Sequence, residues 1–159
     1  TSLYDPENLN WPDLRKNPHL EPGQKAFMSG WCSGAPGIGL ARVANLQIDR
    51  SSTTLNDIEN AVAYTLQYPL HTKDHLCCGN SGRIDFLIEV ALKMDRPELL
   101  EKARQMMSWI INRKELTGHY IFNTGKGKVF NPSFFQGTAG VGYEILRCVA
   151  PKEIYSILN

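Results

Sequence analysis

The stretch that decides the fold is GNSG at residues 79–82, which is followed by the apolar-rich run RIDFLIEVALKM. The same Gly-x-x-Gly pattern occurs as GAPG at 34–37 and as GTAG at 137–140. Each copy precedes a run whose apolar residues follow helical spacing. One such pattern is uninformative, but three that open similar helices indicate an internal repeat. We therefore expect a helix to begin near the second glycine of each copy.

Helices are also expected between the copies. A run that includes Ile58 and Leu66 has helical apolar spacing, with Thr54 as a candidate N-cap and Pro69 as its end. A further run begins near Pro97 and carries charge on one side. The helices opened by glycine are apolar on more than one face, which is typical of buried helices. Pairs of inner and outer helices predict an all-α fold, an α/α toroid or the C-terminal part of one.

Prolines and glycines divide the rest of the chain. Residues 1–23 contain four prolines and are predicted to form an extended connecting segment, and residues 24–159 would form the toroid repeats. Short apolar runs at 120–122 and 128–130 flank a Gly-containing stretch, which predicts a possible hairpin.

Composition excludes several functional classes. The 159 residues suit one domain, and 17 Lys and Arg against 16 Asp and Glu give a net charge of +1. That balance argues against a nucleic-acid groove, which needs clustered positive charge. No apolar stretch reaches the roughly 18 residues of a membrane span, and no leader is recognised, so we expect a cytoplasmic location. Because the chain starts at Thr1, we expect that it was cut from a longer protein.

Three of the four cysteines have a shared placement. Cys32 and Cys77 each lie two residues before the first glycine of a repeat, and Cys78 adds a third thiol. Three thiolates can hold Zn²⁺ and leave its fourth tetrahedral position open. Nearby helix N-termini are expected to ease ionisation of these thiols. Inert buried cysteines are the alternative, and this is the interpretation we favour for Cys148.

The histidines offer one candidate for catalysis. His75 is the histidine near the cysteine pair in sequence, so it is the candidate for a role at the site. His19, His71 and His119 lie in predicted loops and are interpreted as surface residues.

The three motifs together resemble a known family. WCSGAPGIG at 31–39, CCGNSG at 77–82 and FQGTAGVGY at 135–143 are similar to the last repeats of the lanthionine synthetase C-like cyclases. NWPDLR at 10–15 resembles the cyclase domain of bifunctional class II lanthipeptide synthetases. The resemblance implies an α/α toroid with zinc at its centre, of which this chain would be the C-terminal part.

The resemblance also implies ligands and chemistry. Cys32 and Cys77 match family zinc ligands, and Cys78 stands where a histidine is common, while Ser33 departs from the usual neighbour. The implied reaction is addition of a peptide cysteine thiol to dehydroalanine or dehydrobutyrine, which forms the thioether rings of lanthipeptides (lantibiotics). The implied partners are a dehydrated precursor peptide, the missing N-terminal part of the cyclase and an upstream dehydratase domain.

The resemblance leaves the proton-transfer groups unmatched. The family's histidine and aspartate lie upstream of the Trp-Cys motif, and no residue here matches them, so no catalytic residue is assigned and the isolated chain is expected to be inactive. A non-catalytic, zinc-stapled helical module that binds peptides is the alternative. A toroidal glycosidase is ranked last, because it needs a carboxylate pair and these motifs carry cysteine.

Overall fold

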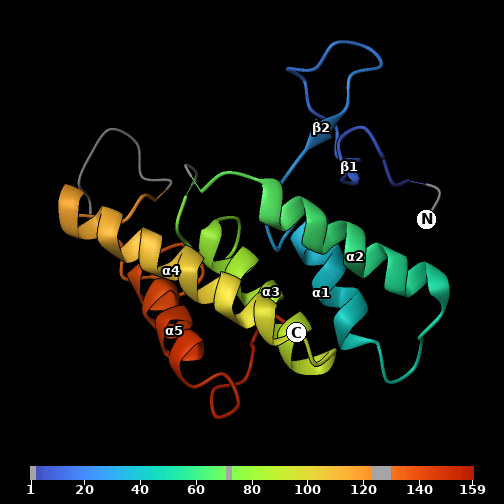
Figure 1. Cartoon of the computed structure of the whole chain (residues 1–159). Coiled ribbons are helices and arrows are strands. Elements are labelled where there is room, and N and C mark those ends of the chain that lie inside the picture. The colour runs from blue at the N-terminus through green and yellow to red at the C-terminus, as the bar shows by residue number, and fades with distance from the viewer. Residues whose placement is uncertain (1–2, 71–72, 123–129) are drawn as a thin grey trace.

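A computed structural model describes residues 3–70, 73–122 and 130–159. In these parts of the chain the regular structure is almost entirely helical, which confirms the all-α prediction (Figure 1). The helices are α1 (Ala35–Ala44), α2 (Ser52–Gln67), α3 (Asn80–Lys93), α4 (Pro97–Thr117) and α5 (Thr138–Val149), and the strands are β1 (Pro12–Asp13) and β2 (Ala26–Phe27).

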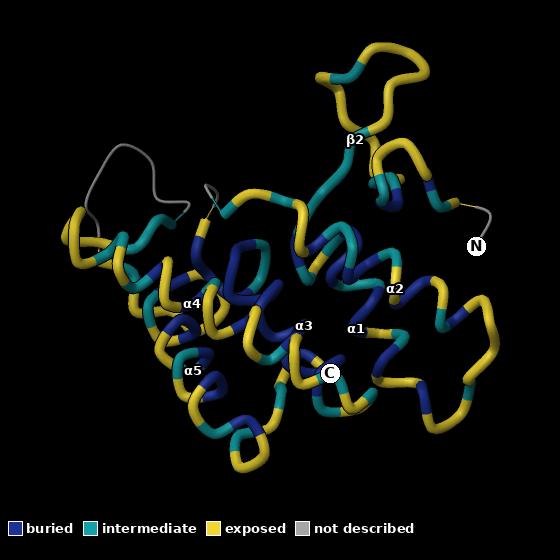
Figure 2. The backbone as a smooth tube through the Cα atoms, viewed as in Figure 1, coloured by how far each residue is buried: buried dark blue, intermediate teal, exposed yellow. Residues whose placement is uncertain are grey.

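The helices form an inner row and an outer row. Helix α3 contacts α1 on one side and α5 on the other, while α2 packs on α1 and α4 packs on α3 and α5. Every residue from Asn80 to Ala91 in α3 is buried, whereas α2 and α4 each bury one face (Figure 2). This is the arrangement expected of inner and outer helices in part of an α/α toroid.

The inner helices begin near the second glycines, as predicted. Their N-caps are the first glycines of the three motifs, so each helix starts two residues before the second glycine. The second glycine lies inside the first helical turn, where a loop carbonyl packs against it. A Cβ added at Gly82 would overlap the carbonyl oxygen of Leu76, and the equivalent overlap occurs at Gly37 and Gly140. The second glycine is therefore required by this close approach rather than by the helix start.

Helix α2 differs from its prediction at the N-cap. The N-cap is Ser51, whose side-chain oxygen accepts a hydrogen bond from the backbone N–H of Thr54. Leu66 belongs to the helically spaced apolar residues but is exposed, whereas the neighbouring Thr65 is buried. The Thr65 hydroxyl donates a hydrogen bond to the carbonyl of Ala61 at 2.7 Å, which offsets the free-energy cost of burying it. The predicted ends hold, since α2 stops before Pro69 and α4 begins at Pro97.

The N-terminal segment is tied to the first helix. Strands β1 and β2 pair antiparallel, with Pro12 opposite Phe27. Asn10 is fully buried, and its Oδ1 accepts a hydrogen bond at 2.8 Å from the backbone N–H of Ala35, the first residue of α1. The side chain of Asn10 therefore caps the N-terminus of α1, because the N-cap residue Gly34 has no side chain to accept this hydrogen bond. The possible hairpin at 120–130 lies largely outside the described residues, and Tyr120–Phe122 is not a strand.

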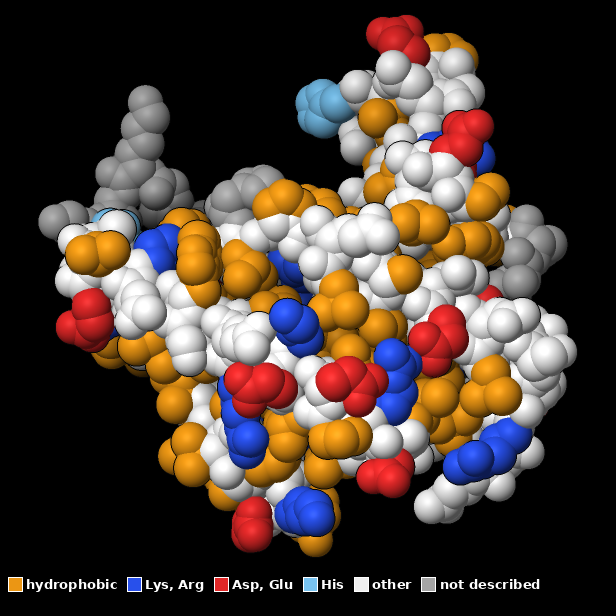
Figure 3. All heavy atoms as spheres, in the orientation of Figure 1, with side chains coloured by type: hydrophobic (Ala, Val, Ile, Leu, Met, Phe, Trp, Pro, Cys, Tyr) orange, Lys and Arg blue, Asp and Glu red, His pale blue; other side chains and the backbone are white. Residues whose placement is uncertain are grey.

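The surface carries mixed charge. On the face shown in Figure 3, acidic and basic side chains are interspersed rather than gathered by sign. Among the described residues, no helix is both long and apolar enough to cross a membrane.

Candidate metal centre

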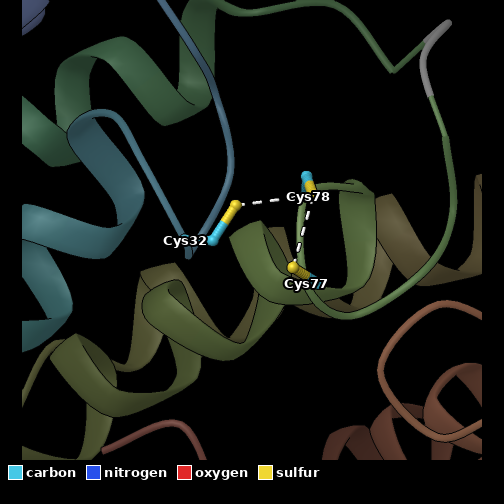
Figure 4. Close-up of side chains that lie close together, drawn as sticks. All are labelled: Cys32, Cys77 and Cys78. Atoms are coloured by element: carbon cyan, nitrogen blue, oxygen red, sulfur yellow. Dashed lines mark hydrogen bonds between the residues drawn. The ribbon is translucent and has the colours of Figure 1, made fainter. Parts of the chain in front are cut away.

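Two loops bring the cysteines together. Cys32 lies three residues before α1, and Cys77 and Cys78 lie immediately before the N-cap of α3 (Figure 4). The backbone N–H of Cys32 donates to the carbonyl of Cys77 at 3.3 Å. The loops also touch at Gly30, where an added Cβ would lie 2.7 Å from the Cα of Cys78. The equivalent positions in successive repeats therefore converge, as their spacing predicted.

The three thiols form a compact cluster. The Sγ atoms of Cys32 and Cys78 are 3.4 Å apart, those of Cys78 and Cys77 are 3.3 Å apart, and all three lie within 4.8 Å of one another (Figure 4). Tetrahedral zinc with sulfur bonds of about 2.3 Å places neighbouring sulfurs about 3.8 Å apart. All three thiols are free of disulfide bonds. The donor set and its spacing therefore fit a zinc ion.

The electrostatics of the cluster favour a cation. Partial burial, followed by the neighbouring Cys78 thiol, raises the pKa of Cys77 to about 12. The same two causes raise the pKa of Cys32, and the charge of Arg15 opposes this rise. Without a metal, burial and the neighbouring thiols therefore oppose the ionisation of these two thiols, which the nearby helix N-termini are expected to ease. A divalent cation would remove this penalty, since it compensates the charge of adjacent thiolates.

The Cys77–Cys78 loop is held by buried hydrogen bonds. The backbone N–H of Cys77 donates to the carbonyl of Phe135 at 2.9 Å, which links the loop to the third motif. Asp74 is fully buried, pairs with Arg113 and accepts a hydrogen bond from the backbone N–H of Ile121 at 2.7 Å. The pair of thiols is thus presented by a fixed loop rather than by a free surface segment.

His75 lies behind the cluster. Its ring is fully buried, and Nδ1 accepts a hydrogen bond from the backbone N–H of Cys78 at 3.3 Å. This contact assigns the other ring nitrogen, Nε2, as the protonated one in the neutral ring. His75 therefore reaches the site through the loop backbone and presents no exposed edge to a substrate.

The other residues considered from sequence do not join the site. Cys148 is buried in α5 and belongs to the hydrophobic core, which confirms its interpretation as a core residue. His19 and His119 are exposed, and His71 lies outside the described residues.

Two neighbours of the cluster were given no role from sequence. Arg15 follows β1, pairs with Asp13 through both carboxylate oxygens and donates to the Sδ of Met28 at 2.9 Å. Its charge acts on Cys32 and Cys78. Phe135 supplies the carbonyl that fixes Cys77. The repeat could have indicated Phe135, because it occupies the position equivalent to Cys77. Arg15 is brought near the cluster by the pairing of β1 with β2.

A comparison with models of protein families gives one result that bears on this centre. Residues 1–158 match the family described as lanthionine synthetase C-like protein. The match extends over the N-terminal segment, all five helices and the three cysteines. The family resemblance seen in the motifs is therefore confirmed.

Proposed function

Because this chain belongs to the lanthionine synthetase C-like family, we propose that it carries the zinc-binding, thiol-activating part of a lanthionine cyclase. The family supports a function of the lanthionine cyclase type. The observation that carries the finer proposal is the cluster of Cys32, Cys77 and Cys78, whose sulfurs lie within 4.8 Å of one another at the family's motif positions.

Three thiolates would hold the metal and leave one position for a substrate. When bound there, zinc would supply a Lewis acid that lowers the pKa of a peptide thiol in the fourth position. Cys32 is exposed, and Cys77 and Cys78 are partly exposed, so a peptide can approach the cluster from solvent. The loops' backbone contacts keep the three sulfurs together for this purpose.

The proposed reaction is a conjugate addition within one dehydrated peptide. The thiolate sulfur of a peptide cysteine attacks the β-carbon of dehydroalanine or dehydrobutyrine, and a carbon–sulfur bond forms. The electron pair of the double bond moves to the α-carbon as an enolate, which then takes up a proton to give the thioether. The product is the lanthionine ring of a lanthipeptide.

Cys78 in place of the family's common histidine affects reactivity. A third thiolate adds negative charge at the metal, so a substrate thiol is acidified less but remains more nucleophilic. The nucleophilicity of a thiolate falls as the pKa of its thiol falls. Replacing the histidine by Cys78 therefore lowers the fraction of ionised substrate thiol but raises the reactivity of the thiolate that forms.

The proton donor is proposed to lie outside this sequence. His75 is fully buried and its Nδ1 is engaged by the backbone of Cys78, so it is not placed to protonate an enolate. A positioned acid typically contributes about 10²–10⁴-fold. We therefore expect this chain to act with an N-terminal part of the cyclase and an upstream dehydratase, on a dehydrated precursor peptide in the cytoplasm.

Cobalt substitution tests whether the fourth position is open. Cobalt(II) bound to the chain reports its sulfur ligands through its absorption spectrum. Addition of a cysteine-containing peptide should increase the thiolate-to-cobalt absorption, and a peptide with serine at that position should not. Cys148→Ala serves as a matched control and should behave as the wild type. An unchanged spectrum with tightly bound cobalt would instead support a structural metal in a non-catalytic peptide-binding module.

Cyclisation is tested by counting thiols. The zinc-loaded chain is incubated with a dehydrated precursor, and the remaining free thiols are alkylated and counted by mass spectrometry. We expect this chain to consume thiols no faster than its Cys32→Ala variant, and a longer protein that includes the chain to consume them faster. Thiol loss by the chain alone, clearly above that control, would place the proton donor within these 159 residues.

A further inference from the structure

The final residues of the chain are anchored on two acidic side chains of α3. Ser156 Oγ donates to Oδ2 of Asp85 at 2.7 Å, and Asn159 Nδ2 donates to Oε2 of Glu89 at 2.7 Å. Asp85 is fully buried and Glu89 nearly so. Both acceptors are thus buried carboxylates, which would be costly to leave without a hydrogen-bond partner.

Arg147 of α5 completes this anchor. Its guanidinium is fully buried, forms an ion pair with Asp85 and contacts Glu89 at 2.6 Å. Its Nε also donates to the carbonyl of Ile154 at 3.1 Å, at the start of the tail. The tail, defined as residues 154–159, is therefore fixed to the inner helices α3 and α5 by one shared polar cluster.

The other end of the tail reaches the residue before Cys32. The indole Nε1 of Trp31 donates to the carbonyl of Leu158 at 3.1 Å. The backbone N–H of Leu158 in turn donates to Ser156 Oγ at 3.0 Å. The indole ring stacks on Phe135, with ring centroids 5.9 Å apart and an interplanar angle of 15°. Trp31 is thus held at its edge by the tail and at its face by the third motif.

The loop that carries Cys32 depends on such external support. Cys32 is exposed, and its backbone N–H makes a long hydrogen bond of 3.3 Å to Cys77. Because Trp31 and Cys32 share a peptide bond, fixing the Trp31 side chain limits where the Cys32 sulfur can move. Groups that orient metal ligands from behind affect metal affinity strongly, typically by about 10–100-fold.

We propose that the tail is a positioning device for the metal centre, which acts through the Trp31–Leu158 hydrogen bond to hold Cys32 against Cys77 and Cys78. The inference rests on the proposed function, since it assumes that the three thiols bind zinc. It assigns Trp31, Leu158 and Ser156 as positioning residues, none of which would touch the metal or the substrate.

Deletion of residues 156–159 is the direct test. Zinc affinity is measured by competition with a chromophoric chelator, and cobalt(II) absorption reports the thiolates bound. The truncated chain should bind zinc about tenfold or more weakly. Its cobalt–thiolate absorption should fall to that of Cys32→Ala, the variant that lacks the same ligand. A role confined to stability would lower the unfolding temperature but leave the spectrum of each bound cobalt ion unchanged.

Two point variants keep the test decisive if the truncated chain does not fold. Trp31→Phe removes the indole donor while keeping an aromatic ring on Phe135, and it should weaken zinc binding in the same direction. Tyr155→Ala is the matched control in the tail, because its side chain is 80% exposed and its backbone contacts remain.

The outcomes separate the inference from the proposed function. Wild-type spectra and zinc affinity in both Trp31→Phe and the folded truncated chain would overturn the role of the tail. Equal weakening by Tyr155→Ala and Trp31→Phe would also overturn it. A wild-type chain that binds neither zinc nor cobalt through thiolates would overturn the proposed function itself.

Discussion

The turn at Cys77-Cys78-Gly79 and the turn at Phe135-Gln136-Gly137 have nearly the same backbone and different chemistry. In both, the first helical residue donates to a carbonyl seven residues earlier, Asn80 to Lys73 at 2.7 Å and Thr138 to Asn131 at 2.8 Å. The turn at Cys77-Cys78-Gly79 presents two thiols to the candidate metal centre. The turn at Phe135-Gln136-Gly137 presents an aromatic ring to Trp31 and a backbone carbonyl to Cys77.

The difference shows that the glycines determine the turn and the two residues before them determine its use. A Cβ would overlap a loop carbonyl oxygen at the second glycine of either motif, Gly82 or Gly140. The positions before the first glycine make no such demand, so they can carry cysteine in one repeat and Phe135 in another. The turn of the third motif thereby contacts the loop of the candidate metal centre without contributing a thiol to it.

The largest expected effect tests whether the two turns share this requirement. Gly82→Ala and Gly140→Ala should each destabilise the chain by about 3 kcal/mol, because a loop carbonyl must move. Gly142→Ala is the matched control within α5, since an added Cβ there meets no atom within 4 Å. It should raise stability by about 0.5–1 kcal/mol, through better helix propensity. Urea denaturation followed by circular dichroism measures all three.

Comparable stability of Gly82→Ala and Gly142→Ala would contradict the claim that the turns require glycine, because the motif glycines would then be interchangeable with an ordinary helical glycine.

A smaller effect separates the two uses of the turn. Phe135→Ala should lower stability by about 1 kcal/mol, because a half-exposed ring and its stacking on Trp31 are lost. Its backbone carbonyl still accepts from Cys77, so zinc binding should weaken far less than in Cys77→Ala. Cys77→Ala should abolish tight zinc binding while changing metal-free stability little. Chelator competition and thermal unfolding, run on both variants, give the two readouts. Loss of zinc from both variants to the same extent would mean that the third turn contributes directly to the metal centre.

The smallest effect concerns a buried carboxyl in the helix that the third turn opens. Burial, followed by the charge of Glu89, raises the pKa of Glu144 well above its ordinary value. The folded state therefore holds a proton that the unfolded state releases above its pKa of about 4.3. Stability contributed by this proton is present at low pH and declines as pH rises toward the folded-state pKa. Glu144→Gln should flatten this decline, measured as unfolding free energy from pH 5 to pH 8. An equal slope in wild type and variant would show that Glu144 is ionised in the fold.

Much of the fold could be predicted because its signals are local. Glycine pairs, helical apolar spacing, Pro69 and Pro97 mark helix starts and ends within a few residues. Apolar spacing includes Leu66 but does not show that Thr65 is buried instead, because the Thr65 hydroxyl can donate a hydrogen bond within the helix. The helix starts near the second glycines were predictable because the glycine pairs mark them, whereas the loop carbonyl that packs against each second glycine becomes known only from the structure.

The candidate centre was partly predictable for a similar reason. Equivalent repeat positions converge in a stacked fold, so the placement of Cys32 and Cys77 before their motifs was sufficient to bring them together. The supporting contacts come from remote segments. Strand pairing places Arg15 near the cluster, and the anchoring of the tail places Leu158 beside Trp31. Neither position follows from local spacing, although Arg15 ends the NWPDLR motif. The raised thiol pKa values also depend on burial and on thiols from two loops.

Metal content and ligand count of the zinc-loaded chain test whether Cys32, Cys77 and Cys78 hold a zinc ion with one open position. Zinc is measured per chain in the wild type and in four single cysteine-to-alanine variants, and X-ray absorption at the zinc edge counts the sulfur ligands. The account predicts one zinc per chain with three sulfurs and one lighter, exchangeable ligand. It also predicts sharp zinc loss in Cys32→Ala, Cys77→Ala and Cys78→Ala but not in Cys148→Ala. Equal zinc retention in all four variants, or four protein ligands in the wild type, would contradict it.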